Sequence, residues 1–65
     1  MFKYPVFVIA QNEDGSRESF HLTVISATPE DALEQAIQQY LPRYREQEGW
    51  RIVAAVDELR ATALP

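Results

Sequence analysis

The sequence contains no cysteine and only one histidine, His21. The lack of cysteine excludes a disulfide framework and a thiolate metal site, and one histidine alone makes a poor metal site. No apolar run approaches the roughly 20 residues of a transmembrane helix. The N-terminal segment also lacks the cleavage pattern of a signal peptide. We therefore expect a cytoplasmic protein that needs no metal or cofactor and does not bind membranes.

The motifs of common enzyme classes are absent as well. There is no glycine-rich phosphate loop, dinucleotide fingerprint or metalloprotease motif, and no serine is spaced for a triad with a histidine and an acid. Glu30, Asp31 and Glu34 cluster within about one helical turn, and paired carboxylates can serve in acid–base chemistry. Acidic residues at a helix N-terminus are, however, what the helix dipole favours without any catalytic role. We therefore expect the protein not to be an enzyme.

The chain has 65 residues and a formal net charge of −4, with ten acidic and six basic residues. This length predicts a single domain over residues 1–65 with a thin core, because such a chain buries only about 60% of its unfolded surface. Small domains often gain stability from a partner or a second copy. The acidic balance weighs against nucleic-acid binding, in which phosphate contacts dominate. It fits a partner protein with a basic surface.

Two strands joined by a turn are predicted in the first part of the chain. Residues 2–11 are rich in β-branched and aromatic side chains and are apolar on both faces, which is typical of a central strand. An Asp-Gly pair marks a turn at residues 12–16. Residues 17–26 alternate between apolar and polar side chains, as a half-buried strand does. Because proline cannot donate a backbone hydrogen bond, we expect regular pairing to begin at or after Pro5.

A helix follows, and its start is clearly marked. Thr28 is a good N-cap, and Pro29 suits the first helical position because the N–H that it lacks would have no partner there. Apolar residues then recur at helical spacing to about Tyr40. Pro42 leaves two alternatives: the helix ends near Leu41 and a second turn starts with Pro42 at its first position, or one helix continues with a kink.

A third strand at residues 50–56 and a short tail at residues 57–65 complete the predicted elements. The tail is expected to fray or to form one turn of helix. The connection rules favour an antiparallel sheet of strand order 2-1-3, with the helix packed on one face. This is an α+β fold of the type β-β-α-β, in which either face of the first strand could meet the helix. The other face has no covering element, so Val53 and Ala55 would be exposed and would suggest a partner or a second copy.

Two sets of residues are candidates for a binding surface. The first would place carboxylates over a basic partner and consists of Glu13, Asp14, Glu18, Glu30, Asp31 and Glu34. The second would stack on the bases and grip the phosphates of RNA or DNA, and it consists of Arg43, Tyr44, Arg45, Trp50 and Arg51. Arginines at a helix C-terminus also complement its dipole, and the aromatic rings also suit a core. The basic and aromatic set is therefore the alternative to the acidic one.

Three segments resemble the N-terminal domain of HicB-type antitoxins, within residues 4–41. They are Tyr4-Pro5-Val6, Glu13-Asp14-Gly15 and the helix entry TPEDALEQA at residues 28–36. The Pro-Asp-Leu-Pro-Gly segment that the family carries between hairpin and helix has no counterpart here, so no residue roles are transferred. The resemblance implies a strand–turn–strand–helix architecture and a small acidic protein that binds and blocks a nuclease.

These observations predict a non-catalytic protein-binding module. Its expected action is inhibition: it would block a basic nucleic-acid-processing protein by occupying the surface of that protein. Antitoxins, and the anti-CRISPR and other anti-defence proteins of phages and mobile elements, are similar in size and charge. The alternatives are a small RNA- or DNA-binding module and a homodimerising structural module.

Overall fold

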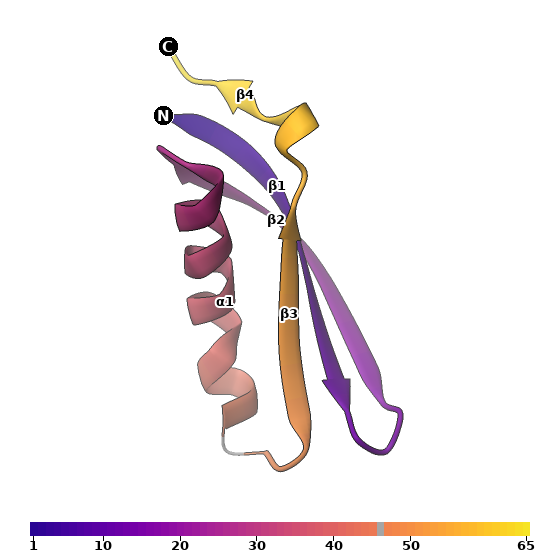
Figure 1. Cartoon of the computed structure of the whole chain (residues 1–65). Coiled ribbons are helices and arrows are strands. Elements are labelled where there is room, and N and C mark those ends of the chain that lie inside the picture. The colour runs from indigo at the N-terminus through magenta and orange to yellow at the C-terminus, as the bar shows by residue number, and fades with distance from the viewer. Residues whose placement is uncertain (46) are drawn as a thin grey trace.

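A computed structural model describes residues 1–45 and 47–65. The elements in chain order are β1 (Phe2–Asn12), β2 (Arg17–Ser26), α1 (Pro29–Arg45), β3 (Trp50–Val56), a short 3-10 helix η1 (Glu58–Arg60) and β4 (Thr62–Ala63). The three long strands form an antiparallel sheet in the order β2-β1-β3, and α1 lies along one face of this sheet (Figure 1). The predicted α+β topology and strand order are confirmed.

The β1–β2 ladder extends further than predicted. It begins at Phe2, which pairs with Ser26, so the expectation that pairing begins at or after Pro5 is wrong. The Pro5 carbonyl accepts a hydrogen bond of 3.0 Å from the backbone N–H of Asp57, on the β3 side of the strand. In an antiparallel strand the N–H and C=O of one residue point the same way. The N–H that proline lacks would therefore also point away from β2, and the β1–β2 ladder loses no hydrogen bond.

The helix α1 begins at the predicted N-cap and continues past Pro42. The backbone N–H of Asp31 donates a hydrogen bond of 3.2 Å to Thr28 Oγ1, which is the N-cap interaction that the sequence predicts. The chain then continues as one helix through Pro42 to Arg45, which decides between the two alternatives. Gly49 turns the chain toward β3 with a φ of +82°, a conformation that glycine adopts without steric cost.

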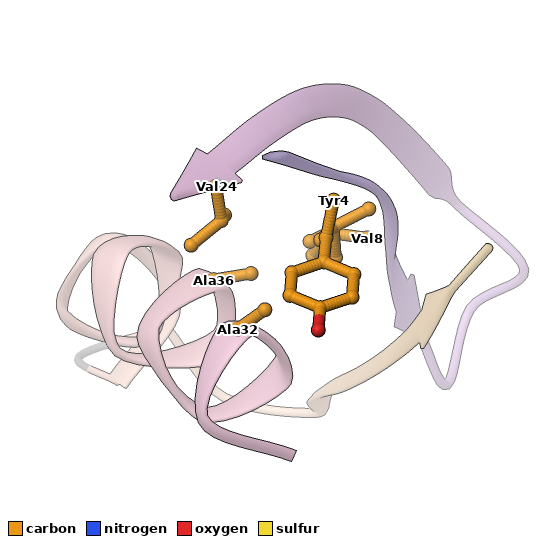
Figure 2. Packing of buried hydrophobic residues seen from close by; sticks show 6 residues of the cluster. Tyr4, Val8, Val24, Ala32 and Ala36 are labelled. Carbon is orange, nitrogen blue, oxygen red and sulfur yellow. The ribbon is translucent and has the colours of Figure 1, made fainter. Parts of the chain in front are cut away.

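The core lies between α1 and the face of the sheet formed by the even-numbered strand residues. Tyr4 and Val8 of β1 point toward Ala32 and Ala36 of the helix (Figure 2). Val6 and Val8 are completely buried, and so are both alanines. The alanines stand one helical turn apart, and their small side chains let the helix approach the sheet closely. This packing decides which face of β1 meets the helix.

The C-terminal segment is more ordered than a fraying tail. The predicted turn of helix is present as η1, but β4 was not predicted: Ala63 pairs with Phe2, and Thr62 pairs with Lys3. A strand of two residues has no alternation pattern that a sequence could reveal. Because β4 returns to the start of β1, both chain termini lie at one end of the molecule, opposite the β1–β2 turn (Figure 1). The molecule is elongated, with extents of 43 × 18 × 14 Å.

Candidate binding surface

The second face of the sheet is not covered by the helix. We call it the open face, and it is formed by the odd-numbered residues from Lys3 to Gln11, from Arg17 to Ile25 and from Arg51 to Ala55. These positions share one face because successive side chains of a strand point to opposite sides of the sheet. The pairing register then determines which of them are neighbours across the strands.

An apolar cluster occupies the middle of the open face. Phe7 and Val53 are 43% and 53% exposed, although both come from strands that also supply the core. Ile9 lies beside Val53, and Ala55 lies beside Phe7. We call these four residues the apolar centre. The predicted exposure of Val53 and Ala55 is confirmed, and an exposed apolar cluster on so small a protein marks a surface suited to binding.

His21 belongs to the same surface. It pairs with Phe7 across β2 and β1, and the two rings stack with centroids 4.5 Å apart and planes inclined by 11°. Its neighbours on the same face of β2 are Ser19 and Thr23, which are neutral. His21 thus extends the apolar centre toward the outer edge of the sheet, next to a phenylalanine ring rather than a carboxylate.

Positive charges stand at both ends of the open face. Gln11 pairs with Arg17 on one side and with Arg51 on the other, so the two arginines flank one strand. Their Cα atoms are roughly 10 Å apart, which is two inter-strand spacings. Lys3 lies at the opposite end of β1. Within the part of the chain that the structure describes, neither Arg17 nor Arg51 forms an ion pair with a carboxylate.

The strand positions of this surface carry no acidic side chain. Within the described strands the one acidic residue is Glu18, and its side chain lies on the helix side of the sheet. There its carboxylate accepts a hydrogen bond from the Tyr44 hydroxyl, and its Oε2 lies 3.9 Å from Nη2 of Arg43. Asp57, just beyond the end of β3, forms an ion pair of 3.3 Å with Arg60. The charged residues at the strand positions of the open face are therefore all basic, and the nearest carboxylates in the same alternation, Glu13 and Asp57, lie just beyond the strand ends.

The six predicted acidic contact residues do not form one patch. Two of them, at positions 13 and 14, lie in the β1–β2 turn, and three lie in the first turns of α1 at the other end of the molecule (Figure 1). Asp31 is engaged internally, because the buried Ser26 hydroxyl donates to its Oδ2 at 2.9 Å. Hydrogen bonds from the side chain and backbone of Ser16 lower the pKa of Asp14 below its ordinary value.

The basic and aromatic set is divided between the two faces of the sheet. Tyr44 is only 4% exposed, and its ring packs against Trp50 with centroids 4.9 Å apart. The guanidinium carbon of Arg43 lies 5.7 Å from the centre of the Tyr44 ring. Arg51, in contrast, projects from the open face, and Arg45 is exposed at the end of the helix. A buried ring cannot stack on a base, so these five residues do not make the predicted patch.

Burial of Tyr44 also changes its acidity. Desolvation, supported by the adjacent Glu18 carboxylate, raises the pKa of the Tyr44 hydroxyl above its ordinary value of 10.0. Both effects disfavour the phenolate. The pair ties the end of α1 to β2, and its contacts are those of a structural interaction.

A shallow cleft adjoins the arginine end of the open face. It encloses about 540 Å³ and is lined by Gln11, Asn12, Glu13, Gly15, Gly49, Trp50 and Arg51. Two hydrogen bonds hold its walls together, from Asn12 Nδ2 to the Glu48 carbonyl (3.2 Å) and from the Glu13 N–H to the Gly49 carbonyl (3.1 Å). Among the described residues, no group of three acidic or histidine side chains is placed to hold a metal ion. The cleft extends the open face at the Gln11 end. The residues that line it include no nucleophile paired with a base.

Comparisons with known protein families, curated proteins and solved structures give no match. The resemblance to HicB-type antitoxins therefore stays a prediction. Residues 1–45 and 47–65 contain no helix with the length and apolar character needed to cross a membrane. The sequence-based candidates also omitted Lys3 and Arg17, although the alternation of β2 places Arg17 in phase with His21 and could have identified it.

Proposed function

We propose that this protein is a non-catalytic protein-binding module that engages its partner through the open face. The observation that carries the proposal is the apolar centre, in which Phe7 and Val53 remain about half exposed. A chain of 65 residues has few large side chains to bury, and its core uses small ones such as Ala32 and Ala36. A partly exposed Phe7 contributes less hydrophobic free energy than a buried one, and a small protein has few other large side chains to bury. A partner that covers Phe7 would supply that burial.

This proposal keeps the predicted class of function and moves the contact surface. Inhibition by occupancy remains one way in which such a module could act. The acidic residues expected to contact a basic protein receive less support as a single surface, because they are divided between the two ends of the molecule. The open face is continuous, spans three strands and combines apolar with charged side chains, as protein interfaces do.

A photo-crosslinking experiment tests this proposal. The photoreactive residue p-benzoylphenylalanine is placed at Val53 in one variant and at Gln38, exposed on the helix, in a matched control. We expect covalent adducts from position 53 in an extract of the source cells, and their loss when Phe7→Glu is added. A second copy of the chain captured at this position would also be a protein partner. Absence of adducts from position 53, or the same adducts from both positions, would refute the proposal.

A further inference from the structure

We infer that the partner of the open face is an acidic amphipathic segment of another protein. Its apolar side chains would cover Phe7 and Val53, and its carboxylates would pair with Arg17 and Arg51. This inference rests on the proposed function and adds the chemistry of the partner. The two observations behind it are the exposed apolar centre and the uniform sign of the charges at the strand positions around it.

The charge of the open face is opposite to that of the whole chain. The protein carries a net charge of −4, yet the open face presents Lys3, Arg17 and Arg51 and no strand carboxylate. Any partner that covers the apolar centre also removes water from the neighbouring guanidinium groups. A charge that loses water without gaining an opposite charge is costly, so the covering surface must supply anions. A carboxylate suits arginine because its two oxygens can accept two parallel N–H hydrogen bonds from the planar guanidinium group.

A second copy of this chain does not satisfy that requirement. Two open faces packed against each other would bring together two sets of three cations, with no strand carboxylate on either face to offset them. Like charges in one interface suppress association. Asp57 is the acidic residue that follows Ala55 in the alternation of β3, and it is already paired with Arg60. The other described acidic residues of a second copy lie in turns, in α1 and η1, or on the helix side of β2.

The apolar centre also favours a protein over a nucleic acid. Single-stranded nucleic acids bind open sheets by stacking bases on aromatic rings. Here the two aromatic rings of the open face, Phe7 and His21, stack on each other, and the other residues of the apolar centre are aliphatic: Ile9, Val53 and Ala55. Aliphatic side chains complement the leucine, isoleucine or phenylalanine side chains of a protein segment.

The dimensions of the face indicate the size of the segment. From Lys3 to Gln11 the strand spans roughly 26 Å, at about 3.3 Å per residue. A helix of about 18 residues covers a similar length, at 1.5 Å per residue. Because both arginines lie at the Gln11 end, carboxylates near one end of such a helix would meet them, while its apolar stripe runs along β1.

Matched peptide probes test the inference. The probe is a fluorescein-labelled amphipathic peptide of about 18 residues, with leucine and phenylalanine on one stripe and glutamate on the other face. Its control carries lysine in place of every glutamate, and a labelled oligouridylate of about 12 nucleotides serves as the nucleic-acid probe. Affinity is measured by fluorescence anisotropy at low salt, and the binding site is mapped by amide chemical shifts of the ¹⁵N-labelled protein.

Two double variants separate local charge from net charge. R17E/R51E reverses the open-face arginines, and R45E/R60E reverses two exposed arginines elsewhere. Each reversal changes the charge by −2, so both variants go from −4 to −8. We expect the acidic peptide to bind, to shift the amides of Phe7 and Val53, and to lose about tenfold in affinity in R17E/R51E. R45E/R60E also breaks the exposed ion pair between Arg60 and Asp57. The loss in affinity should still stay within about threefold, since neither arginine lies at a strand position of the open face and the peptide meets only long-range repulsion. Circular dichroism confirms that each variant is folded, and R17Q/R51Q replaces R17E/R51E if it is not.

Several outcomes would overturn the inference. They are absence of binding by the acidic peptide, equal binding of both peptides, an equal loss in both double variants, tighter binding of the oligouridylate, and dimerisation of the protein alone through the open face. Failure of the underlying proposal gives a different result. If p-benzoylphenylalanine at position 53 forms adducts whose yield R17E/R51E does not reduce, the proposed protein-binding function stands and the inference of an acidic partner is refuted. If position 53 forms none, both fail.

Discussion

Two valines on opposite faces of the sheet provide a direct test of which face is the core. Val8 lies in the central strand and is completely buried, whereas Val53 in β3 is 53% exposed on the open face. Replacing each by alanine removes the same two methyl groups from a strand residue. Any difference in the free energy of unfolding therefore reports on burial.

The magnitudes follow from the exposed fractions. Each buried methylene-sized group contributes about 0.8 kcal/mol, so Val8→Ala loses about 1.6 kcal/mol of transfer free energy. Because the closely packed helix cannot fully collapse onto the site, a cavity term brings the loss to about 2–3 kcal/mol. Val53→Ala loses about half of the transfer free energy and leaves no cavity, so the expected loss is about 0.8 kcal/mol. In so small a domain, about 1 kcal/mol lowers Tm by 4–8 °C.

Urea denaturation of purified protein at low concentration, followed by Trp50 fluorescence, measures both changes. We expect the midpoint to fall at least twice as far for Val8→Ala as for Val53→Ala, with the urea dependence unchanged. Equal losses would show that Val53 is covered in solution, which would refute the assignment of the open face as free surface. In that case the loss for Val53→Ala should also depend on protein concentration.

Three further substitutions test local features of the structure. Thr28→Ala should lower the free energy of unfolding by about 1 kcal/mol, because the first turn of the helix loses its N-cap, whereas Thr28→Ser should retain most of it. Gly49→Ala should lower the free energy of unfolding by about 1–2 kcal/mol, since φ is positive there. The loss should exceed that for Gly15→Ala, because an added Cβ would lie 3.1 Å from Asn12 Oδ1 at position 49 but within 4 Å of no such atom at position 15. The raised pKa of Tyr44 means that the unfolded chain releases this proton first, so the free energy of unfolding should fall as the pH rises above 10.0. Denaturation between pH 8 and 11 should show a smaller fall for Tyr44→Phe, and an equal fall in both proteins would contradict the assigned shift.

Much of the local structure could be predicted because short-range patterns carry it. The bounds of β2 and β3 agree with the predicted residues 17–26 and 50–56, since alternation and flanking turns mark both ends. The helix start is equally local, because Thr28 and Pro29 act within one turn. The helix end is not local. Pro42 breaks one hydrogen bond, and the burial of Tyr44 against Trp50, which comes from another element, accompanies continuation of the helix.

The candidate surface depended on tertiary structure to a greater degree. The sequence alone established the elements, their order along the chain and the presence of apolar side chains on both faces of the first strand, because these follow from residue type and spacing. Only the tertiary structure decided that Arg17 and Arg51 flank Gln11, that Tyr44 is buried, and that the predicted carboxylates lie at two ends. The physical reason is that β1 separates β2 from β3, and pairing between distant segments sets neighbours that spacing along the chain does not encode.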